Sequence, residues 1–222
     1  MFKRTPLQGG DAPRPERSGL TLYAVKPLFQ SLLRPATRRL AAAGVTANAV
    51  TVTAAAGSLA VGGIVALSAT RPAAFLLVPA WFGIRMALNA IDGMLAREHG
   101  QKSDLGAFLN EIGDVVSDAA MIAPFALVSP FGAVGIGLVV ALAGLTEFAG
   151  VLATATGRAR RYDGPMGKSD RALVFGALGA WIGLAGGLPA WFSPLPLILS
   201  LLLLATTVNR VRAALRQHPL SA

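Results

Sequence analysis

The sequence contains no cysteine and few charged residues for a chain of its length. Zero cysteines among 222 residues exclude disulfide bonds and thiolate metal sites. Charged residues make up 14% of the chain and hydrophobic residues 54%, whereas an average soluble protein is about 25% charged. With a mean hydropathy of +0.58, the chain has too few polar residues to coat a soluble globule. The composition therefore predicts an integral membrane protein.

Long apolar stretches are abundant. Six of them are separated by short breaks, and each is near the ~20 residues that a membrane-spanning helix needs. They cover residues 47–69, 73–96, 105–128, 131–156, 171–191 and 194–214. We therefore expect an all-α integral membrane protein with six transmembrane helices, which form one membrane domain over residues 46–215.

The segments outside this domain differ from it in composition. Residues 1–19 are rich in Pro, Gly and Arg and hold no apolar run. This argues against a secretory signal peptide and predicts a disordered cytosolic tail. Residues 20–45 carry apolar side chains at helical spacing beside basic ones, which predicts an amphipathic helix at the membrane interface, although an ordinary soluble amphipathic helix would show the same pattern. Residues 216–222 are expected to form a cytosolic tail.

Positive charge is in excess and unevenly placed. The net charge is +9, and 18 of the 20 Lys and Arg residues fall on one side of the six expected spans. Because basic loops are retained in the cytoplasm, both termini and the two longer loops are expected there, in a bacterial-type inner membrane. A nucleic-acid partner is not expected, because it would require a basic patch with stacking aromatic side chains on a soluble module.

Five acidic residues fall inside the expected spans or at their ends: Asp92, Glu111, Asp114, Asp118 and Glu147. An ionised side chain at the bilayer centre costs about 2.5–3.5 kcal/mol, so these groups must face one another, a cavity or a cation. At about 100° per residue, the polar residues between 110 and 118 share one arc of a helix. The preceding helix, which holds Asp92, is joined to it by a short loop. The two acidic faces are therefore expected to converge on one pocket near the cytoplasmic end.

Three explanations fit such a cluster. Oxygen ligands without His or Cys nearby suit Mg²⁺, Mn²⁺ or Ca²⁺. Intramembrane acids also form proton or sodium relays in transporters. In the third, a structural network between Arg85 and the carboxylates would only fix helix packing, with Glu147 as a candidate partner of Arg85. Clustering by itself leaves all three open.

The spacing of these residues carries more information than their clustering. Residues 89–97 read NAIDGMLAR, and after eight further residues come Gly106, Asn110 and Asp114 at intervals of four. This pattern resembles the signature of the CDP-alcohol phosphatidyltransferase family, D-x-x-D-G-x-x-A-R, eight residues, G-x-x-x-D-x-x-x-D, and every fixed spacing matches. Residues 44–48 and the Gly167-Lys168 pair also fit the family, so that the resemblance covers about residues 20–215.

The resemblance implies a metal-dependent enzyme of phospholipid biosynthesis. Such an enzyme transfers a phosphatidyl group from CDP-diacylglycerol to an alcohol and releases CMP, with one or two Mg²⁺ or Mn²⁺ ions, as a homodimer in the lipid bilayer. By carry-over Asp114 is the catalytic base, and the metal positions are Asn89, Asp92, Asn110 and Asp114. The positions that would contact the donor are Asp92, Gly93, Ala96, Arg97 and Gly106.

The chain departs from the signature at two positions. Asn89 and Asn110 stand where the family has aspartates, so two negative charges are missing. We expect Glu111 to supply a replacement metal ligand, with Asp118 in or near the shell of residues around the ligands. Alternatively the site holds one metal, or Arg85, one turn before Asn89, replaces a cation.

The acceptor alcohol would bind near the basic loop before the fifth expected span. Arg158, Lys168 and Arg171 are candidate ligands for the phosphate of an acceptor such as glycerol 3-phosphate, although basic residues at this place also orient the protein in the membrane. Two other functions stay open. One is a catalytically weakened relative that binds lipid or nucleotide, and the other is an ion-coupled transporter.

Overall fold

The computed structural model describes residues 22–217, and within this range the chain forms helices and no strand. This confirms the predicted all-α class. The expected tail over residues 1–19, and all but the first two residues of the tail over 216–222, lie outside the described residues. The α-helices are α1 Leu22–Ala42, α2 Ala47–Leu67, α3 Leu77–Glu98, α4 Asp104–Ile122, α5 Gly132–Ala155, α6 Lys168–Ala185 and α7 Leu195–Arg216. The short 3₁₀ helices are η1 Pro72–Leu76, η2 Ala123–Leu127 and η3 Ala190–Phe192.

Each of the six apolar stretches corresponds to one of the helices α2 to α7. Within the described residues, four helical segments are long and apolar enough to cross a membrane: Ala47–Leu67, Pro72–Glu98, Gly132–Ala155 and Ala190–Arg216. The other two helices, α4 and α6, are short, and their charged residues leave neither with an uninterrupted apolar stretch of spanning length. The structure thus supports a membrane protein, whereas the count of six spans stays a prediction.

Two of the helices that flank the candidate site, α2 and α4, begin at polar caps. The Thr46 hydroxyl accepts a hydrogen bond from the Ala49 N–H at 3.1 Å at the start of α2. The Ser103 hydroxyl accepts one from the Gly106 N–H at 3.0 Å at the start of α4. Such caps satisfy backbone donors that a helix leaves unpaired at its first turn. They fix where α4 begins and therefore how Asn110 and Asp114 are turned.

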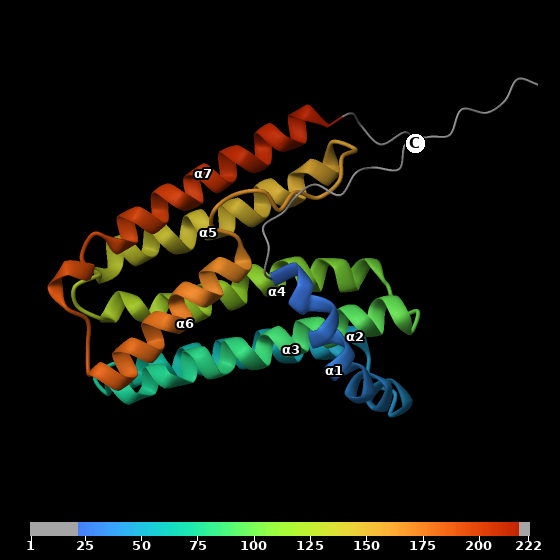
Figure 1. The fold of residues 1–222 in the computed structure, drawn as a ribbon, viewed down its shortest axis with the longest axis horizontal. Helices are drawn as coiled ribbons and strands as arrows, with labels where there is room; N and C mark the ends of the chain where they lie inside the picture. The colour runs from blue at the N-terminus through green and yellow to red at the C-terminus, as the bar shows by residue number, and fades with distance from the viewer. Residues whose placement is uncertain (1–21, 218–222) are drawn as a thin grey trace, which may run out of the picture.

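Figure 1 shows an elongated bundle in which α5 and α7 lie side by side, α2 and α3 lie on the opposite side, and α4 and α6 lie between them. Its apolar core includes the buried rings of Phe75, Phe125 and Phe175, with edge-to-face centroid distances of 5.3 and 5.0 Å. The backbones of α2 and α4 approach closely, because a Cβ added at Gly62 would lie 2.2 Å from the Ala120 carbonyl oxygen. Only glycine fits at this crossing.

Helix α1 lies against α3 at one end of the bundle (Figure 1). Its Arg34 pairs with Glu98 at the end of α3, at 3.0 Å between Nη2 and Oε1. Leu28 and Leu32 on the same helix are exposed. The amphipathic character of this helix and its position at a membrane interface stay proposals.

Candidate functional site

A cavity of about 410 Å³ opens where α2, α3 and α4 meet beside the α3–α4 loop. Its wall includes eight of the residues predicted for metal or donor binding: Asn89, Asp92, Gly93, Ala96, Arg97, Gly106, Asn110 and Glu111. The remaining predicted site residues are not part of this wall: Arg85, Asp114, Asp118, Arg158, Lys168 and Arg171. The two halves of the spaced motif thus meet at one cavity.

Asp92 is the buried carboxylate of this wall. The Thr51 hydroxyl of α2 donates to its Oδ2 at 2.9 Å, which fixes the carboxylate against α2. Among the side chains that the structure describes, residues 28–217, no Lys, Arg or His lies within ion-pair distance of Asp92. The amides of Asn89 and Asn110 make no hydrogen bond to another described residue. Their oxygens are therefore available to a ligand.

Two glycines of the motif leave space that other side chains use. A Cβ at Gly93 would lie 2.9 Å from Arg97 Nη2, so the guanidinium group lies against the backbone of α3. A Cβ at Gly106 would lie 2.7 Å from Asn48 Oδ1, so α4 and the start of α2 come close together there. A larger residue at either position would require the Arg97 or the Asn48 side chain to move.

At the rim of the cavity, Gln101 connects the α3–α4 loop to the start of α2. Its Oε1 accepts a hydrogen bond from the Ala47 N–H at 2.7 Å, and its Nε2 donates to the Val45 carbonyl at 3.4 Å. The loop therefore stays attached to the first turn of α2, which also carries the Asn48 side chain.

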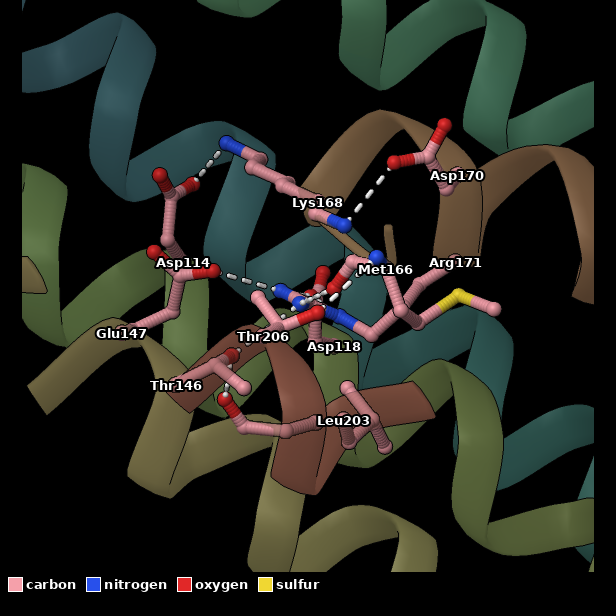
Figure 2. A network of polar contacts seen from close by, with 12 residues as sticks. Asp114, Asp118, Thr146, Glu147, Met166, Lys168, Asp170, Arg171, Leu203 and Thr206 are labelled. Atoms are coloured by element: carbon pink, nitrogen blue, oxygen red, sulfur yellow. Dashed lines mark hydrogen bonds and ion pairs between the residues drawn. The ribbon is translucent and has the colours of Figure 1, made fainter. Parts of the chain in front are cut away.

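Asp114 belongs to a buried ion-pair network beside the cavity. Its Oδ1 accepts hydrogen bonds from Arg85 Nη2 at 3.2 Å and from the Lys168 ammonium group. Asp118, one turn further along α4, accepts from Arg85 and from Arg171, each at 2.6 Å. Figure 2 shows Lys168 and Arg171, both from the first turn of α6, directed toward the carboxylates of α4 and α5. The network joins α3, α4 and α6.

Glu147 of α5 extends this network to α7 and to the loop before α6. It pairs with Arg171 at 2.8 Å and with Arg160 and Arg210 at 3.2 Å each. The expectation that Glu147 pairs with Arg85 is wrong. Arg85 on α3 faces α4, whereas Glu147 faces α6 and α7, so the two residues share Asp118 and Arg171 as intermediates.

The basic residues of the α5–α6 loop have separate partners. Arg160 pairs with Glu111 on the cavity wall as well as with Glu147. Arg158 instead donates to the backbone carbonyls of Thr156 and Gln217, at 3.2 and 3.1 Å. Lys168 and Arg171 lie together beside α4, and Arg158 does not join them.

The neighbouring Arg161 has a carboxylate partner in its own loop. Its guanidinium group donates twice to Asp163, at 2.8 and 2.9 Å. Burial opposes the ionised form of Asp163, but these hydrogen bonds from Arg161 outweigh it and hold the pKa of Asp163 below its ordinary value. Arg161 is therefore paired within the α5–α6 loop, whereas Arg160 pairs with Glu111 and Glu147 outside it.

Comparison with known proteins identifies the chain. A sequence profile described as CDP-alcohol phosphatidyltransferase matches residues 44–210. The chain belongs to the CDP-alcohol phosphatidyltransferase family. This family membership makes it an enzyme of the phosphatidyltransferase class, as the spaced motif predicts.

The chain is also similar to two individual proteins. It is 48% identical over 196 residues to the inner membrane protein YnbA of Escherichia coli (strain K12), covering 88% of this chain and 97% of YnbA. Its fold is similar to that of Mycobacterium tuberculosis phosphatidylinositol phosphate synthase (PgsA1) with CDP-DAG bound, with a TM-score of 0.68 at 20% identity, covering 82% of this chain and 92% of PgsA1. The same synthase in complex with manganese and citrate gives a TM-score of 0.67, also at 20% identity, covering 82% of this chain and 88% of PgsA1.

The donor set of this CDP-alcohol phosphatidyltransferase fits a hard divalent cation. Asp92 and Glu111 offer carboxylate oxygens and Asn89 and Asn110 offer amide oxygens to one cavity, and oxygen ligands suit Mg²⁺ and Mn²⁺. Among the described residues, no group of three or more His, Cys, Asp or Glu side chains is placed to hold a metal ion. A metal ligand set in this cavity would therefore have to include the amides, and it would be poorer in charge than the family signature.

Several residues of the site were not predicted from the sequence. Thr51, Asn48 and Gln101 line the cavity but are common residue types without a distinctive spacing. Arg160 and Arg210 belong to the basic residues of the expected cytoplasmic side, and nothing in the sequence showed that both pair with the buried Glu147. The signal that could have revealed them is the need for partners of Glu111 and Glu147, since an unpaired buried carboxylate is costly.

Proposed function

We propose that this chain transfers a phosphatidyl group from CDP-diacylglycerol to an alcohol and releases CMP. The supporting observation is the cavity between α3 and α4, whose wall holds the family motif around Asp92. In the proposed reaction the alcohol oxygen attacks the β-phosphorus, the bond from that phosphorus to the CMP oxygen breaks, and the hydroxyl proton passes to the Asp114 carboxylate. A base at the acceptor hydroxyl makes this attack possible at neutral pH.

The residues of the cavity would divide the work of binding. Asp92, Asn89, Asn110 and Glu111 would hold a divalent cation, which when bound neutralises the diphosphate and stabilises the departing CMP. Gly93 and Ala96 would leave space for the nucleotide along α3, and Arg97 lies at the same wall to meet a phosphate. Gly106 would leave space for the nucleotide along α4.

The acceptor would bind on the side of Asp114 that faces Lys168. The Lys168 side chain is 32% exposed and donates to Asp114, so it can reach both the base and an incoming phosphate. Arg171, only 2% exposed, is held by Asp118 and Glu147 and would support the pocket from behind. Arg158 would not contact the acceptor, and would instead hold the α5–α6 loop in place through its hydrogen bonds to the Thr156 and Gln217 carbonyls. A phosphorylated polyol such as glycerol 3-phosphate is the acceptor class that this charge favours.

The topology belongs to the same proposal. Six spans rest on the lengths of the apolar stretches, and an interfacial α1 rests on its amphipathic pattern. Cytoplasmic termini and a cytoplasmic cavity mouth follow from the positive-inside rule. An inner-membrane location follows from the likeness to YnbA, and a homodimer follows from the family resemblance alone.

The decisive experiment is an assay of the purified full chain in lipid nanodiscs with labelled CDP-diacylglycerol, Mg²⁺ or Mn²⁺, and a panel of alcohols. We expect metal-dependent CMP release with one phosphorylated polyol, and its loss in Asp114→Ala. Ion flux without any nucleotide dependence would favour a transporter and contradict the proposal.

A second function is favoured by Asn89 and Asn110, which lower the charge of the ligand set. The chain would then bind CDP-lipid tightly without turning it over. Under this alternative, Asn89→Asp combined with Asn110→Asp would create CMP release that the unmodified chain lacks, whereas an active unmodified chain would exclude it.

A further inference from the structure

We propose that this site binds a single divalent cation at Asp92, and that Arg85 supplies to Asp114 the positive charge of a second ion. The inference rests on the proposed function, because it concerns the charge that the site presents to a CDP-linked diphosphate. Arg85 is a positioning residue here, since it acts through the Asp114 carboxylate.

Arg85 occupies the space between two carboxylates of α4. Its side chain is 3% exposed, and its planar fork reaches Asp118 Oδ1 at 2.6 Å and Asp114 Oδ1 at 3.2 Å. Its Nη2 also donates to the Asp114 backbone carbonyl at 3.2 Å. A rigid guanidinium group bound to two carboxylates and one carbonyl is pre-organised and strongly held. Asp114 is therefore already neutralised by the protein itself.

Asp92 presents the opposite case. Its one side-chain partner is the Thr51 hydroxyl at 2.9 Å, and the amides of Asn89 and Asn110 share its cavity wall. A buried carboxylate without a cation partner is costly. Of the five intramembrane acids, Asp92 is thus the one whose charge calls for an external cation.

The formal charges of the site point the same way. The connected ion pairs contain four carboxylates and five cations, so the network together with Asp92 is neutral, and Arg97 and Lys102 on the cavity wall add two positive charges. The site is therefore positive before any ion binds. The diphosphate of CDP-diacylglycerol, with one negative charge on each phosphate, would offset the charge of one divalent ion. A second divalent ion would add two further positive charges in a site of low dielectric constant, where such an excess is unfavourable.

The sequence changes agree with this balance. The replacement of two family aspartates by Asn89 and Asn110 removes the negative charge that one divalent ion would neutralise. Arg85 lies one turn before Asn89 on the same face of α3 and adds a positive charge to the same cluster. All three positions shift the site in the direction of fewer external cations.

The test measures Mn²⁺ binding to the purified full chain in nanodiscs, by electron paramagnetic resonance of free Mn²⁺, with and without CDP-diacylglycerol. We expect one ion per chain for the unmodified protein. The triple variant Arg85→Met, Asn89→Asp, Asn110→Asp is expected to bind two. With Asn89→Asp and Asn110→Asp but Arg85 retained, the second ion is expected to bind at least about tenfold more weakly than in the triple variant, because the guanidinium group repels it.

Two single variants protect the test against misfolding of the triple variant. Asp92→Asn should lower Mn²⁺ affinity at least about 100-fold, whereas Asp114→Asn should lower it less than about tenfold. Arg34→Met, which removes an arginine with an exposed partner on α3, should leave the stoichiometry unchanged. Two ions in the unmodified chain, or equal losses in the two aspartate variants, would overturn the inference. Because binding needs no turnover, one bound ion without CMP release would refute the proposed function and leave this inference standing.

Discussion

Asp92 and Asp114 are the two aspartates of the motif that this chain retains, and their surroundings differ. Asp92 lies on the cavity wall with a hydroxyl and no cation beside it, whereas Asp114 is held by Arg85 and Lys168. Two aspartates of the same motif thus lie in different electrostatic environments. The comparison teaches that a protein can satisfy one carboxylate with its own cations and leave the other for a ligand.

The largest effect is expected when the Asp114 carboxylate, which pairs with Arg85 and Lys168, is neutralised. In Asp114→Asn we expect CMP release to fall about 10³-fold, because the proposed base is lost and general base catalysis contributes about 10² to 10⁴. The measurement is the rate of CMP release at saturating donor. Asp104→Asn, in the exposed first turn of the same helix, is the matched control and should keep its rate; an active Asp114→Asn would remove Asp114 from the mechanism.

The next largest effect should come from Glu147→Gln, which tests whether the network is structural. The change leaves Arg171 and Arg210, which are almost completely buried, without one of their acceptors. Breaking a buried ion pair costs about 3 kcal/mol, so we expect a clearly lower melting temperature in detergent. Asp163→Asn, in the α5–α6 loop and partnered by Arg161, should melt close to the unmodified chain. Equal melting of the two variants would show that the network does not stabilise the fold.

Glu111→Gln tests whether Glu111 acts as a metal ligand beside Asp92 or only as a member of the ion-pair network around Asp114. It lies on the cavity wall and also pairs with Arg160. If it ligates the cation, its loss should weaken Mn²⁺ binding about 50-fold. Unchanged metal affinity and activity would assign Glu111 to the ion-pair network alone.

The smallest expected effect concerns the orientation of Asp92. Thr51→Val removes the hydroxyl that donates to Asp92 and keeps the shape of the side chain, and we expect Mn²⁺ affinity to fall about tenfold. Thr53→Val is the matched control, because its hydroxyl donates only to the Ala49 carbonyl on an exposed face of the same helix. Equal affinity in the two variants would show that Thr51 does not position Asp92.

The sequence predicted the helices and the cavity wall well, because both depend on local patterns. Apolar stretches of spanning length became α2 to α7, and the spacing from Asn89 to Asn110 brought both ends of the motif to one cavity. The tails and the interfacial position of α1 stay predictions.

The partners of the buried carboxylates could not be predicted in the same way. Arg85 and Asp118 are 33 residues apart and Glu147 and Arg210 are 63 apart, so their pairing depends on how whole helices pack. The expectation for Glu147 failed for this reason. A charge in a span can be recognised from the sequence as needing a partner, but the choice among five nearby cations is made by tertiary structure.

The crossing of α2 and α4 at Gly62 links the packing of the bundle to the geometry of the cavity in this chain. Thr51 and Gly62 lie on the same buried face of α2, three turns apart, so any side chain at position 62 would act as a wedge against Ala120 and tilt the helix. The tilt would move Thr51 relative to Asp92, although position 62 touches no ligand. In a library of variants at this position, selected for folded protein, we expect glycine to be recovered almost alone.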